Sequence, residues 1–364
     1  MVDTNKFLNL LIKNKINFFS GVPDSCTSQL CNLLNSNKKI KNFVAPNEGH
    51  AVSLGIGYHL SSGGIPCVYL QNSGLGNAID PITNLISKDI YNLPLLMIIG
   101  WRGRPGLKDE PQHNIQGKIL LKTLKSYEID YQVLNREGDF IKINNLIKKI
   151  KTKSLRGAII VDKNTFSKTI KKQQQEQSSL KRQDVINFLL KKINKKTKII
   201  SSVGYNSREL YQIRKEKFFK NGKDFLVVGG MGHTLSIALS YSLNKNEPTI
   251  CLDGDGSFLM HLGSFVLLNK IGRKNFKYIM IDNNSHESVG DQKINVSFQN
   301  YEKLAKYLGF KNYYYIDSSK SLHQIGKFLK SNGPSFLHAK IKIGTLNNLV
   351  RPNNFKKIKE NFMH

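Results

Sequence analysis

Short apolar segments alternate with amphipathic segments along this chain, and no other feature restricts its fold so strongly. From residue 16 to 162, strand-like runs separated by helix-like windows read INFFSGV, NFVAP, PCVYLQ, LPLLMIIG and GAIIVD. The pattern restarts near residue 197 with TKIISSVG, DFLVVGG, TICLDGDG, FKYIMIDNN, NYYYID and PSFLHAKI. Strands that alternate with helices form parallel sheets covered by helices on both faces. We therefore predict two doubly wound, mainly parallel α/β domains.

A polar segment separates the two patterns. It reads KNTFSKTIKKQQQEQSSLKRQ from residue 163, and its low complexity and lack of apolar periodicity are typical of a linker. The sequence thus predicts a first domain over residues 1–165, a basic linker over 166–183 and a second domain over 184–364, without a middle domain. A chain of 364 residues is long enough for two such cores.

The net charge of +29 is the usual sign of a polyanionic partner. Lysine is accompanied throughout by asparagine and isoleucine, however, and the basic residues lack the interleaved aromatic side chains on which bases stack. We therefore expect no nucleic-acid partner, although a basic nucleic-acid-binding protein stays open as the non-enzyme alternative.

Cysteine usage and hydropathy indicate a cytoplasmic protein without a membrane partner. The four cysteines form no Cys-x-x-Cys pair and no metal-ligand spacing, so we expect reduced thiols that pack inside the protein. No window approaches the roughly 18 continuous apolar residues of a membrane span. The first residues are typical of an amphipathic helix and not of a signal peptide.

An acidic residue occupies a turn that would ordinarily suit a phosphate. Asp255 follows the apolar run TICL and lies between Gly254 and Gly256, with Ser257 next. Glycines let a ligand approach the backbone, and the amides that begin a helix attract anions. A carboxylate would repel a bare phosphate, but a divalent cation accepts both kinds of oxygen. The turn therefore predicts a metal-bridged phosphate.

Further oxygen ligands follow at the end of another predicted strand. After 26 intervening residues, YIMIDNNS supplies Asn283 and Asn284. If the two strands are neighbours, Mg²⁺ would take Asp255, one asparagine, a backbone carbonyl and phosphate oxygens. Gly-Asp-Gly alone indicates no more than a tight turn, whereas its pairing with Asn-Asn indicates a cofactor site.

This combination resembles the signature of the thiamine-diphosphate enzymes. The resemblance implies that Asp255, an asparagine and a carbonyl two residues later hold the Mg²⁺ that binds the diphosphate. We prefer Asn283 with the carbonyl of Ser285, and Asn284 stays the alternative. The resemblance also marks VVGGMGHT and the Gly-Asp-Gly turn as the cofactor site, with Met231 supporting the bent cofactor. These implied cofactor contacts are Gly230, Met231, Gly232, Gly254, Asp255, Gly256, Ser257 and Asn283.

The same resemblance requires a glutamate in the first domain, and FVAPNEGHAVSLGIGYHL provides Glu48. A carboxylate at this strand end is costly to bury unless it exchanges a proton or meets a donor. In the enzymes that this chain resembles, the residue protonates a ring nitrogen of the cofactor's aminopyrimidine. The alternative is a solvated glutamate in the first turn of a helix.

A basic loop offers candidate substrate ligands. WRGRPGLKDEPQH places Arg102, Arg104, Lys108 and His113 after a strand, where they would bind a phosphonate or carboxylate unless the loop is merely solvated. Candidate groups for proton transfer complete the predicted catalytic set with Glu48: Asp24, Ser25, His113, His286 and Glu287.

Within the thiamine-diphosphate enzymes, six segments resemble the phosphonopyruvate decarboxylases: GVPDS, NEGHA, QNSGLGNAIDP, WRGRPGLKDEPQH, GDGSFLMHLGS and HESVGDQ. The resemblance implies conversion of 3-phosphonopyruvate to phosphonoacetaldehyde and CO₂ in phosphonate biosynthesis. Sulfopyruvate or another small 2-keto acid is the alternative substrate. It further implies a homodimer or higher homo-oligomer, in which each site combines the first domain of one subunit with the second domain of its partner.

Overall fold

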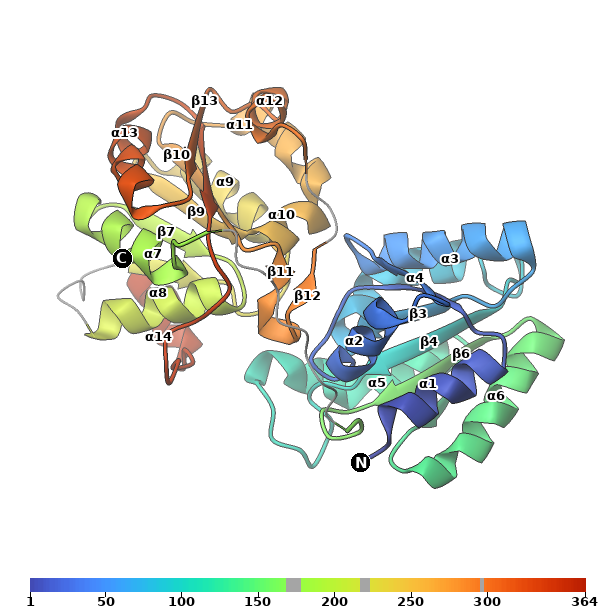
Figure 1. Cartoon of the computed structure of the whole chain (residues 1–364). Coiled ribbons are helices and arrows are strands. Elements are labelled where there is room, and N and C mark those ends of the chain that lie inside the picture. The colour runs from blue at the N-terminus through green and yellow to red at the C-terminus, as the bar shows by residue number, and fades with distance from the viewer. Residues whose placement is uncertain (168–177, 217–222, 295–297) are drawn as a thin grey trace. The chain divides into compact units, whose positions relative to one another are not determined.

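The computed structural model describes residues 1–167, 178–216, 223–294 and 298–364. The chain divides into two compact units, residues 1–173 with 289–292 and residues 174–288 with 293–364. Each unit is a six-stranded parallel sheet with helices on both faces (Figure 1), which confirms the predicted fold class. No middle domain occurs among the described residues.

The first unit orders its strands β2-β1-β3-β4-β6-β5. The strands are β1 (Phe18–Gly21), β2 (Lys41–Val44), β3 (Cys67–Gln71), β4 (Leu95–Gly100), β5 (Asp130–Val133) and β6 (Arg156–Val161). The α-helices are α1 (Thr4–Lys13), α2 (Ser28–Ser36), α3 (Glu48–Ser62), α4 (Leu75–Asn84), α5 (Asn114–Ser126) and α6 (Phe140–Lys153).

Two apolar cores lie on opposite faces of this sheet. In β3, Cys67 and Tyr69 belong to the core formed with α1, α2 and α6, whereas Val68 and Leu70 belong to the core formed with α3, α4 and α5. Strands buried on both faces read as continuous apolar runs, which is why the sequence revealed them. The edge strand β5 was not predicted, because its sequence DYQV is only half-buried and carries polar residues.

The second unit orders its strands β13-β14-β10-β9-β7-β8. The strands are β7 (Lys198–Ser201), β8 (Lys223–Leu226), β9 (Thr249–Gly254), β10 (Phe276–Asp282), β13 (Asn312–Ile316) and β14 (Ser335–Lys340), and a separate two-stranded sheet joins β11 (Ser285–His286) to β12 (Gln292–Lys293). The α-helices are α7 (Arg182–Lys192), α8 (Tyr205–Glu216), α9 (Thr234–Asn244), α10 (Asp255–Met260), α11 (Leu268–Ile271), α12 (Tyr301–Tyr307), α13 (Gln324–Lys330) and α14 (Phe355–Met363).

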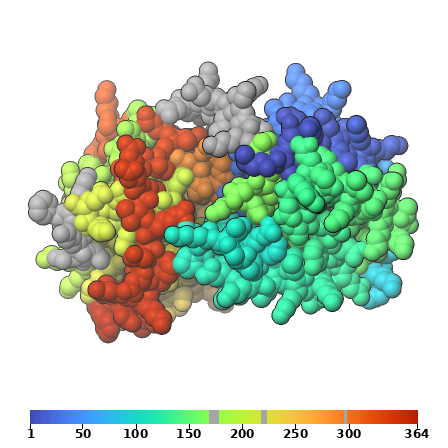
Figure 2. Space-filling model, turned by 90° about the horizontal axis from the view of Figure 1, so that it is seen from below, coloured from blue at the N-terminus to red at the C-terminus, as the bar shows by residue number. Residues whose placement is uncertain are grey.

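This sheet is also covered on both faces. Side chains of α7, α8 and α13 form one core, and side chains of α9, α10, α11 and α12 form the other. The C-terminal helix α14 joins the second core through Phe362, whose ring lies 5.6 Å from that of Phe225 and 4.9 Å from that of Tyr241. Figure 2 shows the C-terminal residues on the surface of this unit.

In each sheet the strand order changes direction at the first strand in the sequence. In the first unit, β1 lies between β2 and β3, and in the second unit β7 lies between β8 and β9. Doubly wound sheets bind ligands beyond the carboxyl ends of the strands at such reversals. The loops after β1, β3, β7 and β9 are therefore where each unit offers a site.

The predicted linker covers residues 166–183, and residues 168–177 of it lie outside the described residues. On either side of them, Phe166 is buried in the first unit and Leu180 in the second, and α7 begins at Arg182. All four cysteines are free and buried, as expected. In the described part of the chain, no helix has the length and apolar character needed to cross a membrane.

Candidate active site

Glu48 is a buried acid at the first position of α3. Asn47 precedes it as the N-cap and accepts the backbone N–H of His50 at 3.0 Å, so the helix begins at the glutamate. The side chain lies in the interior, and Asn77 Nδ2 donates to its Oε2 at 2.8 Å. Burial raises the pKa of Glu48 above its usual value, although the hydrogen bond from Asn77 opposes this. A raised pKa favours the protonated form of the carboxyl group and suits it to proton exchange.

Gly74 makes room for this carboxyl group. A Cβ at position 74 would lie 2.3 Å from Glu48 Oε1 and 2.6 Å from its carboxyl carbon. The glycine ends a short 3-10 helix (Asn72–Gly74) that leads from β3 into α4, the helix that carries Asn77. Glu48, Gly74 and Asn77 therefore form one packed group. Of the three, only Glu48 was predicted from the sequence to have a functional role.

Gly74→Ala is expected to displace the Glu48 carboxyl and to lower kcat by about 100-fold, because misplacing a reacting group by about 1 Å costs that much. The measurement is steady-state turnover of the cofactor-loaded enzyme. Gly76→Ala is the matched control, since a Cβ there meets nothing within 4 Å. Equal activity of the two variants would contradict the packing argument.

Beyond β1, Asp24 and Ser25 meet the basic loop. Asp24 is buried, its Oδ1 accepts the backbone N–H of Cys26 at 2.8 Å, and burial raises its pKa. Arg102 Nη1 donates to Ser25 Oγ at 3.0 Å. The structure thus brings Asp24, Ser25 and Arg102 together at the carboxyl ends of β1 and β4.

Arg102 is held by Asp109 of the same loop. Its Nε and Nη2 donate to the two Asp109 oxygens at 2.8 and 2.6 Å, and the backbone N–H of Gly103 donates to Asp109 at 2.8 Å. Burial opposes ionisation of Asp109, but the hydrogen bonds from Arg102 and Gly103 outweigh it and lower its pKa to about 2. A two-point pair of this kind fixes the guanidinium plane, and one nitrogen, Nη1, is left for Ser25 or a ligand.

The other predicted substrate residues differ in their surroundings. Arg104 forms an ion pair with Asp162 at 2.7 Å, and its guanidinium lies over the ring of Trp101. Its positive charge is therefore already paired within the protein. Lys108 is exposed. Burial, followed by the charge of Arg102, lowers the pKa of His113 to about 4, so this imidazole is neutral at pH 7.

In the second unit, a cavity of about 80 Å³ lies at the strand reversal between β7 and β9. Its walls contain most of the residues predicted for the cofactor and its metal: Met231, Gly254, Asp255, Gly256, Ser257, Asn283, Ser285, His286 and Glu287. The flanking Gly230 and Gly232 have φ values of 71° and 87°, and the backbone N–H of Gly232 donates to Ser257 Oγ at 3.1 Å. Left-handed backbone favours glycine at these two positions.

Asp255 is a half-buried carboxyl group without a cationic partner among its described contacts. Its Oδ1 accepts the backbone N–H of Gly256 at 2.9 Å and its Oδ2 that of Asn284 at 2.7 Å. Burial, reinforced by the nearby charge of Asp282, raises the pKa of Asp255 to about 8. A divalent cation would supply the missing positive charge.

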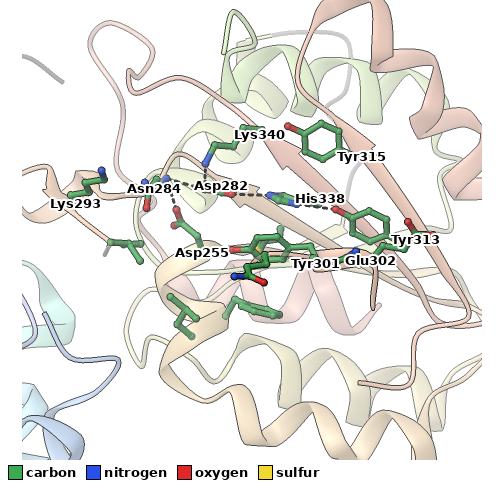
Figure 3. Close-up of a pocket in the computed structure, with 16 residues that line it drawn as sticks. Asp255, Asp282, Asn284, Lys293, Tyr301, Glu302, Tyr313, Tyr315, His338 and Lys340 are labelled. Carbon is green, nitrogen blue, oxygen red and sulfur yellow. Dashed lines mark hydrogen bonds and ion pairs between the residues drawn. The ribbon is translucent and has the colours of Figure 1, made fainter. Parts of the chain in front are cut away.

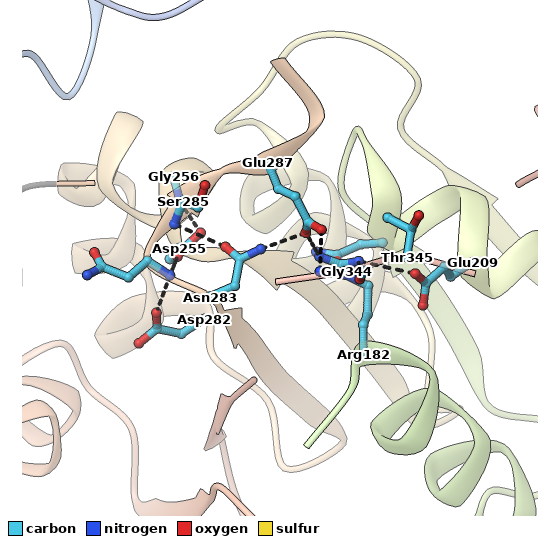
Figure 4. A network of polar contacts seen from close by, with 12 residues as sticks. Arg182, Glu209, Asp255, Gly256, Asp282, Asn283, Ser285, Glu287, Gly344 and Thr345 are labelled. Atoms are coloured by element: carbon cyan, nitrogen blue, oxygen red, sulfur yellow. Dashed lines mark hydrogen bonds and ion pairs between the residues drawn. The ribbon is translucent and has the colours of Figure 1, made fainter. Parts of the chain in front are cut away.

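The two candidate asparagines face different cavities. Asn283 lines the cavity that contains Asp255 and Ser285, its Oδ1 accepts the backbone N–H of Ser285 at 3.1 Å, and its Nδ2 donates to Glu287 at 2.7 Å (Figure 4). Asn284, with a φ of 55°, lines a second cavity (Figure 3). Asp255 lies in the walls of both cavities, so the difference between them is Ser285, which lines the cavity of Asn283 and not that of Asn284.

The described residues fit a bound Mg²⁺. Asp255, Asn283 and the carbonyl of Ser285 offer the oxygen donors that this ion prefers. Ser285 Oγ is buried and has no hydrogen-bond partner among the described residues, which leaves a polar group available for a ligand. No cluster of three or more His, Cys, Asp or Glu side chains in the described ranges is arranged for another metal. Burial lowers the pKa of the neighbouring His286 to about 4, so it is neutral at pH 7.

The second cavity, of about 620 Å³, was not predicted from the sequence (Figure 3). At its wall, Asp282 accepts His338 Nε2 at 2.8 Å and Lys340 Nζ at 2.9 Å. Tyr313 extends this chain through its hydroxyl, 3.0 Å from His338 Nδ1. Burial opposes ionisation of Asp282, but His338 and Lys340 lower its pKa to about 2. Asp282 therefore keeps its negative charge and contributes to the raised pKa of Asp255.

The fold and the two sites define a class of protein. Two sequence models of thiamine pyrophosphate (thiamine diphosphate) enzymes match the chain, the N-terminal TPP binding domain over residues 4–126 and the C-terminal TPP binding domain over residues 200–339. The first contains Glu48 and Asn77, and the second contains the Gly-Asp-Gly turn and Asn283. The chain belongs to the thiamine pyrophosphate enzymes.

Its relatives are decarboxylases. Phosphonopyruvate decarboxylase of Streptomyces viridochromogenes is 27% identical over 92% of this chain and 87% of its own length. Sulfopyruvate decarboxylase of Methanosarcina acetivorans is 24% identical over 94% of this chain and 92% of its own length. The β subunit of sulfopyruvate decarboxylase from Methanothermobacter thermautotrophicus is 30% identical over 40% of this chain and 74% of its own length. The chain is thus a thiamine-diphosphate-dependent keto acid decarboxylase, and the non-enzyme alternative is wrong.

Proposed function

We propose that this decarboxylase converts 3-phosphonopyruvate and a proton to phosphonoacetaldehyde and CO₂, a step in phosphonate biosynthesis. The observation that carries the choice of substrate is the similarity to a phosphonopyruvate decarboxylase over 92% of the chain. The held guanidinium of Arg102 adds support, because it suits a small substrate that carries two anionic groups.

The proposed roles follow from the cavity at the strand reversal of the second unit and from the surroundings of Glu48. When bound, thiamine diphosphate supplies the electron sink that decarboxylation needs. Asp255, Asn283 and the Ser285 carbonyl would hold Mg²⁺, and Met231 with the glycines beside it would line the cofactor site. Glu48, oriented by Asn77, would hold and release a proton at its carboxyl group beside the cofactor's aminopyrimidine ring.

Substrate contacts are proposed for the loop after β4. Arg102 Nη1 and Ser25 Oγ, 3.0 Å apart, bind an anionic group of the substrate. Asp24, whose pKa is raised by burial, is the candidate for donating the proton that replaces CO₂. His113 and His286 are neutral at pH 7, so they can only relay a proton that they first accept. Lys108 is exposed and contributes positive potential. Arg104 contributes less to substrate binding, because its charge is paired with Asp162.

We also propose that the enzyme is at least a homodimer. Glu48 and Asp255 belong to different units of the chain, and the proposed centre needs both. We infer that each centre takes Glu48 from one subunit and Asp255 from its partner.

A CO₂-release assay across substrates tests the proposed reaction. We expect kcat/KM for phosphonopyruvate to exceed that for sulfopyruvate by at least about tenfold, because the held guanidinium of Arg102 pairs more strongly with a doubly charged phosphonate than with a singly charged sulfonate. Pyruvate should be slower still, because it lacks the second anionic group. Omission of thiamine diphosphate and Mg²⁺ is the control and should abolish release.

Sulfopyruvate is the second candidate, favoured by the whole-length relative from Methanosarcina acetivorans. A higher kcat/KM for sulfopyruvate would assign that substrate instead. Absence of CO₂ from all three acids, under conditions in which the cofactor binds, would reject both.

A further inference from the structure

Glu287 was predicted to transfer protons, but its carboxylate is fully engaged by the protein. Oε1 accepts the backbone N–H of Gly344 at 2.6 Å. Oε2 accepts Arg182 Nη2 at 2.5 Å and Asn283 Nδ2 at 2.7 Å (Figure 4). With a side chain only 7% exposed, Glu287 meets donors from α7, from the end of β10 and from the loop after β14. Its geometry suits orientation of a neighbour better than exchange with a substrate.

The neighbour that it orients is Asn283. An ionised carboxylate only accepts hydrogen bonds, so the NH₂ end of the Asn283 amide must face Glu287. Oδ1 is thereby turned toward the backbone N–H of Ser285, 3.1 Å away, on the side of the cavity that Asp255 lines. A flipped amide would set two donors against each other at Ser285 and would present N–H groups to a cation.

Arg182 prevents Glu287 from moving away. Its guanidinium is buried and donates through Nη1 to Glu209 Oε1 and to the carbonyl of Gly344, both at 3.2 Å. Glu209 in turn accepts the backbone N–H of Leu346 at 3.2 Å. Charge-assisted hydrogen bonds between buried groups are strong, and Arg182 is tied to two carboxylates and a carbonyl, so it holds Glu287 in place.

We propose that Glu287, held by Arg182, is a positioning residue that fixes the Asn283 amide with its oxygen toward the metal ion of the cofactor. The inference rests on the proposed function, since it takes Asn283 as a metal ligand. Removing a group that orients a metal ligand typically weakens metal binding by about 10–100-fold.

The test is the affinity for Mn²⁺, used as a spectroscopic substitute for Mg²⁺, in saturating thiamine diphosphate. Electron paramagnetic resonance counts the free ion and needs no turnover. In Glu287→Gln, a donor replaces one acceptor, so the Asn283 amide loses its fixed orientation. We expect Mn²⁺ affinity to fall by about 10–100-fold. Arg214→Met is the matched control, because it breaks an ion pair with Asp224 in the same unit that does not line the cavity, and it should leave the affinity unchanged.

A rescue experiment separates orientation from a general structural role. The double variant Asn283→Asp with Glu287→Gln reverses donor and acceptor, so we expect it to recover at least about tenfold of the lost affinity. If Glu287→Gln does not fold, Glu287→Asp keeps the charge but withdraws it by one methylene, and a loss of at least threefold in affinity is expected.

The outcomes are distinguishable. Mn²⁺ affinity within threefold of the unaltered protein in a folded Glu287 variant would overturn this inference alone. Failure of the unaltered protein to bind Mn²⁺ with thiamine diphosphate would overturn the proposed function and this inference with it.

Discussion

Asp255→Ala is expected to abolish Mg²⁺-dependent binding of thiamine diphosphate while leaving the fold intact. The carboxylate is the one anionic ligand in the proposed metal set, and its loss removes the charge that brings the cation into a buried cavity. Thermal unfolding measures the effect, because a ligand that binds only the folded state raises Tm. The unaltered protein should gain stability on addition of cofactor and Mg²⁺, and the variant should not.

The asparagines provide the control for this experiment. Asn283→Ala should share the loss, whereas Asn284→Gly, which tolerates the φ of 55°, should retain the stabilisation by cofactor. A full rise in Tm for Asp255→Ala would remove Asp255 from the metal site. Loss with Asn284→Gly but not with Asn283→Ala would exchange the two asparagines.

The pKa of Asp255 also predicts how cation binding depends on pH. Because its pKa is raised to about 8, the cofactor-free protein holds a proton there that Mg²⁺ must displace. Affinity should therefore rise about tenfold per pH unit below pH 8 and level off above it. A carboxyl whose folded pKa is raised binds more protons in the folded state, so the cofactor-free protein should lose stability as pH rises from about 4 to about 8.

Glu48→Gln is expected to lower kcat by about 100- to 10,000-fold without loss of cofactor binding. The amide keeps the size of the side chain and can accept the hydrogen bond from Asn77, but it cannot exchange a proton. Turnover and the rise of Tm with cofactor are measured on the same preparation.

An exposed glutamate is the control. Glu137→Gln removes the charge of a surface residue that pairs with Lys6, and it should leave both kcat and cofactor binding unchanged. Because Glu48 is buried and its pKa is raised, its replacement by glutamine should not destabilise the cofactor-free protein. Turnover of Glu48→Gln close to that of the unaltered enzyme would exclude Glu48 as the proton-exchanging group.

Much of the fold was predictable because both sheets are buried on both faces. The strands β3, β4, β9 and β10 are continuous apolar runs between polar loops, and such runs stand out in any sequence. The edge strand β5 and the short strands β11 and β12 were not predicted, because their sequences carry no apolar pattern.

The candidate site was predictable where one local motif carries it. Gly-Asp-Gly at the end of one strand and Asn-Asn at the end of its neighbour place Asp255 and Asn283 together, because parallel strands end at the same edge. Asn77 lies in a segment that the sequence analysis singled out, but nothing local indicates that its amide reaches Glu48, 29 residues away. Arg182 lies in the segment predicted to be a linker, so no functional role was predicted for it.

The sequence by itself determined the fold class, the cofactor class and the two acids Glu48 and Asp255, since these follow from short-range patterns in the chain. The tertiary structure decided which partners each side chain has. It paired Asn77 with Glu48, Arg104 with Asp162, and Glu287 with Arg182, which lies 105 residues earlier. The physical reason is that a buried polar side chain takes its role from the donors and acceptors that folding brings within hydrogen-bond distance.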